Sequence, residues 1–294
     1  MIDKTKVLFS SLKDKLSINL ELVDILDDYY ILIDNDKRYY HLYVLDYNEY
    51  NIYLDLKKSK YLKLPIEEIK YNDVYLLLYL LKLKKDKAII LLDRVKILEN
   101  IYYEYSHTIK LSKKNSGLLK NQTRILNNKF SYFEMRIRNI EMKRIKNDLD
   151  WIILSKYHII LDSRIYLYDL LDDIFRYIDK EKEINIGLIF KNPFLLSYEN
   201  KKIEPYFNLY YGPIGILYAR IYIEYFSFDK NFLNDTIKKL DGFNKTYFLY
   251  SCIYILIIRL NFDIEMRADL FIDITRILSI IISNFGYITK ESFK

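Results

Sequence analysis

The residues most suited to chemistry lie between Ile184 and Arg220, where two apolar runs precede a Gly-Pro corner and an expected helix start. The runs are Ile186–Phe190 and Phe194–Tyr198, and the corner is Gly212-Pro213. A strand, a turn, a second strand, a corner and a helix could together hold a phosphate group. Metal-dependent phosphate chemistry also needs carboxylates and often a histidine, and this segment has only Glu199 and Glu204 and no histidine.

Other reactive side chains are scattered along the chain. His41, His107 and His158 lie far apart and lack the close spacing of metal ligands, so we interpret each as structural. Cys252 is the only cysteine, which excludes a disulfide or a cysteine-based zinc site and fits a reducing compartment. Because it lies in an apolar run, we expect a buried, inert thiol.

Serines and paired acids give no stronger signal. Ser155 and Ser163 lack a Gly-x-Ser-x-Gly context. Asp27-Asp28 and Asp172-Asp173 are adjacent pairs, and adjacent helical residues point apart, so we expect them to be solvated. We therefore predict no catalytic residue, no metal-binding residue and no cofactor.

The most basic stretch is Arg136–Lys146. Glu134 and Glu141 offer nearby partners, which favours a solvated helix over a docking surface for a polyanion or an acidic partner. Trp151 and its tyrosine neighbours are expected to build core.

Composition limits the class of protein. Half of the chain is hydrophobic (51%), enough for a substantial core, and its 31 tyrosines point to an AT-rich genome. The net charge of +6 comes from interspersed charges, 46 basic and 40 acidic, which does not favour a nucleic-acid binder. The apolar runs Tyr247–Leu260 and Ile277–Ile282 fall short of the ~20 residues of a membrane span, and no secretory signal is evident. We expect a cytoplasmic protein without a membrane span.

The elements expected in the first part of the chain form a small α+β lobe. A short helix over residues 1–17 precedes a hairpin of Tyr29–Ile33 and Tyr39–Tyr47, joined by the turn Asp34–Lys37. The remaining expected elements are the extended segments Asn51–Leu56 and Lys60–Leu64, the helix Ile66–Leu83 and the strand Ala88–Leu92.

The rest of the chain is expected to be mostly helical. The expected helices are Ile97–Ser106, Phe130–Ile145, Asp148–Leu161, Arg164–Lys180, Leu217–Phe226, Lys245–Phe262 and Arg267–Phe285, with Leu111–Gln122 as a loop or frayed helix. We predict two domains: a small β-rich lobe, residues 1–95, and a mostly helical lobe, residues 96–294, with an internal β hairpin near 184–211. The fold class is α+β and bilobal, with a small antiparallel β lobe and a larger helical lobe.

This order of lobes resembles the protein-kinase-like fold of the aminoglycoside-phosphotransferase and choline-kinase-like superfamily, and most closely its spore-coat-associated bacterial members. In that family a His-Gly-Asp loop is followed by an Asn; the Asp positions the attacking hydroxyl and the Asn holds Mg²⁺. The matching residues here are Ile186, Gly187 and Leu188, and Asn192 stands one place early, with Pro193 in the expected position.

The other motifs implied by the resemblance also lack their charged groups. The family's Asp-Phe-Asp or Asp-Phe-Glu motif matches Pro205, Tyr206 and Phe207, and an Asp that braces the catalytic loop matches Leu217. Tyr39–Tyr47 contains no phosphate-binding lysine, and no glycine-rich loop is present, since the first glycine is Gly117. Apolar side chains supply no ligand for Mg²⁺.

The leading hypothesis is therefore a pseudokinase, a kinase-like protein without phosphotransfer chemistry that binds, scaffolds or regulates an unknown protein partner. One alternative is an active small-molecule phosphotransferase with unusual acids, such as Asp162 or Glu204. Another is a basic accessory protein of a nucleic-acid, viral or plasmid complex. A fourth possibility is that residues 184–220 are a simple hairpin in an unrelated α+β protein.

Overall fold

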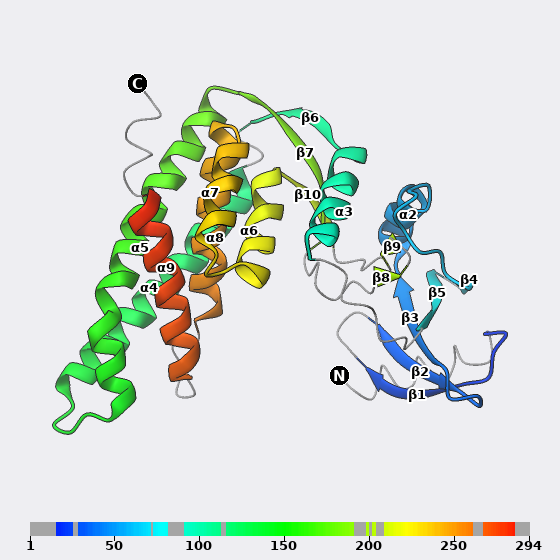
Figure 1. The fold of residues 1–294 in the computed structure, drawn as a ribbon, viewed down its shortest axis with the longest axis horizontal. Helices are drawn as coiled ribbons and strands as arrows, with labels where there is room; N and C mark the ends of the chain where they lie inside the picture. The colour runs from blue at the N-terminus through cyan, green and yellow to red at the C-terminus, as the bar shows by residue number, and fades with distance from the viewer. Residues whose placement is uncertain are drawn as a thin grey trace. The chain divides into compact units, whose positions relative to one another are not determined.

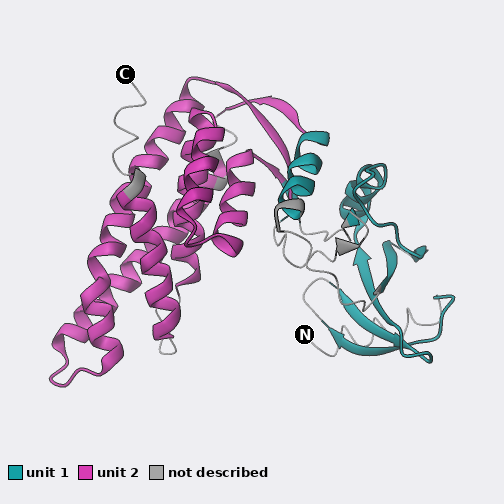
Figure 2. Ribbon diagram, in the orientation of Figure 1, with its two compact units in different colours: residues 1–104, 190–210 teal, residues 105–189, 211–294 magenta. Residues whose placement is uncertain are grey.

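The chain folds into two compact units (Figures 1 and 2). The first comprises residues 1–104 and 190–210, and the second residues 105–189 and 211–294. The computed structural model describes residues 16–25, 29–71, 73–81, 91–112, 116–190, 198–199, 202–203, 209–260 and 267–285. The expected helix over residues 1–17 lies almost entirely outside these ranges. The domain boundaries drawn from the sequence, 1–95 and 96–294, stay a prediction.

A five-stranded antiparallel sheet in the order β1-β2-β3-β5-β4 organises the first unit (Figure 1). Its strands are β1 (Leu20–Ile25), β2 (Tyr30–Asp34), β3 (Tyr39–Leu45), β4 (Glu67–Tyr71) and β5 (Val74–Leu81). The predicted hairpin is confirmed, because β2 and β3 pair around residues 35–38, with Tyr30 opposite Leu42 and Ile33 opposite Tyr39.

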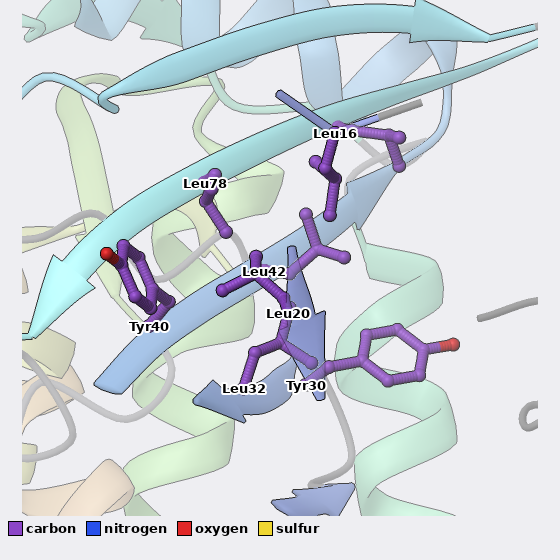
Figure 3. Packing of buried hydrophobic residues seen from close by; sticks show 8 residues of the cluster. Leu16, Leu20, Tyr30, Leu32, Tyr40, Leu42 and Leu78 are labelled. Atoms are coloured by element: carbon purple, nitrogen blue, oxygen red, sulfur yellow. The ribbon is translucent and has the colours of Figure 1, made fainter. Parts of the chain in front are cut away.

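One face of this sheet carries a leucine-rich core (Figure 3). Side chains alternate along β3, so Tyr40 and Leu42 point to the same face and meet Leu32 and Leu78 from the flanking strands. Leu32, Leu42 and Leu78 are fully buried. Burying each such side chain contributes about 1.5–3 kcal/mol, so this face holds the sheet together.

Three expected elements of the first unit are wrong. Ile66–Leu83 is not a helix but contains the hairpin strands β4 and β5. Asn51–Leu56 is not extended but belongs to helix α2 (Tyr47–Leu56). Lys60–Leu64 forms no strand beyond a single bridge residue. For the expected strand Ala88–Leu92, residues 88–90 lie outside the described ranges, and helix α3 (Leu91–Glu104) begins at the next residue.

Helix α2 is attached to the sheet through one carboxylate. Glu68 of β4 accepts hydrogen bonds from Tyr50, from Tyr53 at 3.2 Å and from Lys57 at 2.6 Å. Desolvation alone would raise the pKa of Glu68, but the hydrogen bonds from Lys57 and Tyr50 outweigh it and lower the pKa. The ring of Tyr50 also stacks on Tyr75, with centroids 3.6 Å apart.

The β2–β3 turn is closed by another carboxylate, Asp34, which is buried. Its side chain accepts from the Arg38 backbone at 2.9 Å, from Arg38 Nε at 2.7 Å and from the Tyr40 hydroxyl at 2.8 Å. Desolvation opposes ionisation, but these hydrogen bonds and the Arg38 charge lower the pKa of Asp34 to about 2.

Because the folded-state pKa of Asp34 is below its ordinary value of 3.8, the stability that this group contributes is complete above that value and is lost as pH falls towards about 2. We expect Asp34→Asn to lower the urea midpoint at neutral pH. The difference between the midpoints of variant and wild type should shrink as the pH falls from 3.8 towards about 2. Asp36→Asn is the matched control, because Asp36 also contacts Arg38 but is 72% exposed. A difference that does not change with pH would contradict this assignment.

Helices and one small sheet form the second unit. The sheet has the order β10-β7-β6, from β6 (His107–Lys110), β7 (Glu183–Phe190) and β10 (Leu209–Gly212). The described helices are α4 (Ser116–Met142), α5 (Asp148–Asp179), α6 (Ile214–Tyr225), α7 (Lys230–Lys239), α8 (Gly242–Arg259) and α9 (Ala268–Phe285). None of these helices is long and apolar enough to cross a bilayer.

The helical part differs from the expectation in four places. Helix α4 starts at Ser116, inside the segment expected as a loop or frayed helix. The two helices expected between Asp148 and Lys180 are one continuous helix, α5, and helix α7 was not expected. Trp151 does not build core, because 59% of it is exposed on α5.

Helix α8 packs against α5 and α6 at the centre of this unit. A Cβ at Gly215 of α6 would overlap the carbonyl oxygen of Asn244 and lie 2.8 Å from the Phe248 nitrogen, so only glycine permits this close helix crossing. Cys252 of α8 is fully buried, which confirms the predicted burial, and burial raises the pKa of its thiol well above the ordinary value.

Candidate functional site

The segment matched to a catalytic loop lies in strand β7. Ile186 pairs with His107 of β6, and Gly187 and Leu188 follow it along the strand. From Gly187 to Phe190 every residue is buried, and Leu188 is 2% exposed. The position matched from the sequence to a catalytic aspartate therefore holds an apolar side chain away from water.

The position matched to the bracing aspartate is also apolar and buried. Leu217 lies in the first turn of α6 and is 1% exposed. The helix begins directly after Pro213, whose fixed φ of −61° suits a helix start. Gly212 and Pro213 are themselves buried, so the chain is already inside the packed unit where α6 begins.

The remaining matched residues fall outside the described ranges. They are Asn192, Pro193, Pro205, Tyr206 and Phe207. Between them, β8 (Tyr198–Glu199) and β9 (Lys202–Ile203) pair antiparallel, with Tyr198 opposite Ile203.

The donor set at the described matched positions does not fit Mg²⁺, because Leu188 and Leu217 offer no oxygen ligand. Asp162, one alternative acid, is exposed on α5, and Glu204, the other, is outside the described ranges. In the described part of the chain, no three His, Cys, Asp or Glu side chains come together as a metal site would require.

Strand β3, matched from the sequence to the lysine-bearing strand, contributes His41 and Tyr43 to an aromatic cluster with Tyr29 and Tyr79. His41 and Tyr43 of β3 lie on the face opposite the leucine-rich core, and Tyr79 pairs with His41 across β5. The ring of Tyr29 lies 4.5 Å from that of His41 and 5.3 Å from that of Tyr43, and Tyr43 meets Tyr79 edge-on at 5.6 Å. His41, Tyr43 and Tyr79 are buried, so rings rather than an ammonium group occupy this face.

The other reactive side chains are not brought together. His107 contacts the ring of Tyr211, and His158 is exposed on α5. Ser155 and Ser163 donate their hydroxyls to backbone carbonyls one turn earlier in α5, at 2.8 and 2.7 Å. Both hydroxyl groups are therefore engaged by the backbone of α5.

The two adjacent acid pairs have different outcomes. Asp172 is exposed, as expected. Asp173 is not solvated: it is 7% exposed and contacts Arg176 at 3.1 Å, and burial raises the pKa of its carboxyl. Residues 27 and 28 lie outside the described ranges.

A cavity of about 480 Å³ opens in the helical unit beside the first residues of β7. Lys182, Asn185, Tyr177 and the start of α8 at Asp241 line it. Of the matched residues that the structure describes, Ile186, Gly187, Leu188 and Leu217, none lines this cavity.

Ion pairs in and beside the basic stretch join it to α5. The sequence did not indicate these pairs. Glu134 binds Arg164 of α5 at 2.5 Å, and Lys143 binds Asp150 at 2.8 Å. Asp150 was not among the candidates, although the spacing Asn147-x-x-Asp150 is that of a helix capping pair and was a readable signal.

Comparison with known proteins identifies the fold. No protein-family model matches the sequence, and no curated protein matches it. Among solved structures, an aminoglycoside phosphotransferase from Alicyclobacillus acidocaldarius superposes with a TM-score of 0.59 at 10% identity, covering 92% of this chain and 90% of that one. Spectinomycin phosphotransferase (TM-score 0.46, 10% identity, 95% and 97% covered) and a choline kinase from Streptococcus pneumoniae (0.38, 9%, 96% and 99%) are looser matches that add no support.

At 10% identity the first likeness establishes the fold alone. It confirms the predicted fold class, a small antiparallel β lobe and a larger, mostly helical lobe. The chain has the same kinase-like fold as this aminoglycoside phosphotransferase.

Proposed function

We propose that this chain is a catalytically degenerate kinase-fold protein that acts as a binding, scaffold or regulatory component. The observation that carries the proposal is the burial of Leu188 and Leu217, 2% and 1% exposed, at positions where the family has aspartates. Phosphotransfer relies on positioned charges and metal ions, and leucine supplies neither. The kinase-like fold by itself does not confer that activity.

The aromatic cluster of the first unit supports the same proposal. A lysine ammonium group positions phosphates in kinase-like folds, whereas β3 offers buried rings at His41 and Tyr43. Packed rings give this face of the sheet rigidity without a cationic group for a nucleotide phosphate.

The partner that we propose is another protein, in the cytoplasm. Interspersed charges make an extended nucleic-acid footprint the weaker alternative. The lone buried Cys252 is compatible with a reducing compartment.

Titration with Mg-ATP tests the proposal directly. A ligand present at a hundred times its dissociation constant stabilises the folded state by about 2.7 kcal/mol, which raises the Tm by several degrees. We expect Mg-ATP to raise the Tm by less than about one degree, because the acids that would hold the metal are absent.

The matched controls are ATP with a chelator, and Mg-ATP added to an active aminoglycoside phosphotransferase. Calorimetry on the same samples should show no saturable heat with this chain. A shift of several degrees that requires Mg²⁺, or consumption of ATP in the presence of an aminoglycoside or choline, would overturn the proposal in favour of an active phosphotransferase.

A further inference from the structure

The end of α4, its connection to α5 and the first turn of α5, residues Met142–Trp151, are together called the hairpin tip, which exposes large apolar side chains. Ile145 is 87% exposed and Met142 83%, the highest values among the large hydrophobic residues that the structure describes. Trp151, the fourth residue of α5, is 59% exposed. Single exposed apolar residues are ordinary, but three within one short connection form a distinct surface feature.

Internal hydrogen bonds hold the hairpin tip in this conformation. The side chain of Asp150, 1% exposed, accepts from Lys143 Nζ at 2.8 Å with both oxygens and from the Asn147 backbone at 3.1 Å. Asn147 in turn accepts from the Asp150 backbone at 2.8 Å. Lys146 donates to the carbonyl oxygen of Lys143 at 3.0 Å and closes the end of α4. Since the polar groups of the turn satisfy one another, Ile145 and Met142 are held outward.

Cationic groups surround the exposed apolar side chains. Ile145 lies within the sequence Lys143-Arg144-Ile145-Lys146, and the Lys146 ammonium group lies 5.7 Å from the centre of the Trp151 ring. Arg138, one turn before Met142, is also exposed. Tryptophan beside lysine and arginine is the composition that proteins place at the boundary between water and lipid.

The acids at the hairpin tip do not cancel this charge. Asp150 is neutralised within the turn by Lys143, which leaves Glu141 and Asp148 as the exposed acids. Arg138, Arg144 and Lys146 outnumber them. Positive charge next to apolar side chains favours a surface that is both anionic and able to accept apolar groups.

The narrow shape of the hairpin tip favours a lipid bilayer over a protein as its binding partner. In Figure 1 the α4–α5 connection, in green, projects past the near end of α9 at one extremity of the helical unit. A stable protein interface usually needs about 800 Å² from each partner, which a narrow turn does not offer. A turn does suit a bilayer, because a few side chains can enter the headgroup region while the rest stay in water.

We propose that the hairpin tip docks this protein on an anionic lipid bilayer. Ile145, Met142 and the ring of Trp151 enter the headgroup region, and Arg144, Lys146 and Arg138 contact lipid phosphates. The protein associates with the membrane surface through this turn.

The fluorescence of Trp151 tests the proposal, because it is the only tryptophan of the chain. The full-length protein is titrated with unilamellar vesicles of equal parts phosphatidylglycerol and phosphatidylcholine, and with vesicles of phosphatidylcholine alone. We expect the emission to shift to shorter wavelength with the anionic vesicles only, and the shift to weaken as salt is raised. Co-sedimentation with the vesicles measures the bound fraction independently.

Variants separate the apolar and ionic contributions. Met142→Ser with Ile145→Ser is expected to lower partitioning roughly tenfold or more. Arg138→Gln with Arg144→Gln is expected to lower it by roughly tenfold on anionic vesicles, because each basic residue near such a surface contributes appreciably to binding. Ile66→Ser, at a 50% exposed site in the first unit, is the matched control and should bind like wild type. All these side chains are exposed, so circular dichroism and Tm should stay unchanged.

Three results would overturn the proposal. The first is no shift of Trp151 emission with anionic vesicles. The second is equal binding by the Met142→Ser, Ile145→Ser variant and wild type. The third is a Trp151 shift with single-stranded RNA or an acidic peptide but none with vesicles, which would assign the hairpin tip to a soluble polyanion instead.

Discussion

Replacing Leu188 with Asp, the residue that the resemblance implies at this position, is expected to destabilise this protein strongly and not to create a phosphotransferase. Leu188 is 2% exposed in β7 and continues into the buried Ile189 and Phe190. A carboxylate in such a place is desolvated without an opposing charge, which costs about 4 kcal/mol or more. The urea midpoint at neutral pH, followed by circular dichroism, measures the loss.

The pH dependence of Leu188→Asp identifies the cause. Burial raises the pKa of the new carboxyl above its unfolded value of about 4, so the penalty grows as pH rises above that value and shrinks below it. Leu188→Asn, which has the same shape without the charge, should show a smaller, pH-independent loss. Leu64→Asp, at a 50% exposed site, should be near neutral. If Leu188→Asp is as stable as wild type and binds Mg-ATP, the position is a working catalytic site and the pseudokinase proposal fails.

The second large effect is expected at Gly215. Replacing it with Ala adds a Cβ that would overlap the Asn244 carbonyl oxygen and crowd the Phe248 nitrogen. These are backbone atoms inside α8, so they cannot rotate away as a side chain would. Helices α6 and α8 must separate, which we expect to cost about 3 kcal/mol and to lower the Tm by roughly 5–10 °C.

Gly117→Ala is the matched control for this substitution. Gly117 is also helical, near the start of α4, but a Cβ there meets nothing within 4 Å. Alanine has the higher helix propensity, so this variant should be neutral or stabilised by up to about 1 kcal/mol. Equal effects of the two substitutions in thermal unfolding would show that helix propensity, and not the crossing of α6 and α8, decides the outcome at Gly215.

The order of the lobes could be predicted from the sequence because strand-forming and helix-forming patterns occupy different parts of the chain. The β2–β3 hairpin was readable from its Asp34–Lys37 turn between two runs rich in tyrosine and aliphatic residues. The expected helix over Ile66–Leu83 was wrong because Val74–Leu81 is apolar at nearly every position, and such a run fits any period. Strand β5 is central and buried on both faces, with Leu76 and Leu78 in the leucine-rich core and Leu77 and Tyr79 opposite.

Helix α2 was missed although its signal was present. The segment Asn51–Leu56 is rich in Ile, Tyr and Leu, which suggested a strand. Asp46 and Glu49, however, form a capping box, in which each side chain accepts from the other's backbone, at 2.8 and 3.0 Å. A local hydrogen-bonding pattern thus outweighed residue propensity.

For the candidate site, the sequence alone shows which residue types occupy the matched positions, but not whether they are buried. The sequence shows that Leu188 and Leu217 stand where acids are expected, but their burial depends on strands and helices distant in the chain. The exposure of Trp151 was not predictable, because it follows from a turn held by Lys143 and Asp150, and aromatic residues are most often core. Contacts between side chains of two helices leave no periodic trace in the sequence.

The reactivity of the single cysteine reports local opening of the helical unit. Cys252 is fully buried in α8, which packs against α4, α5, α6 and α9. A water-soluble thiol reagent can modify it only during moments when α8 leaves its neighbours. The rate of modification therefore depends only on how often the helices around Cys252 separate. Unfolding of the β sheet in the other unit does not change this rate.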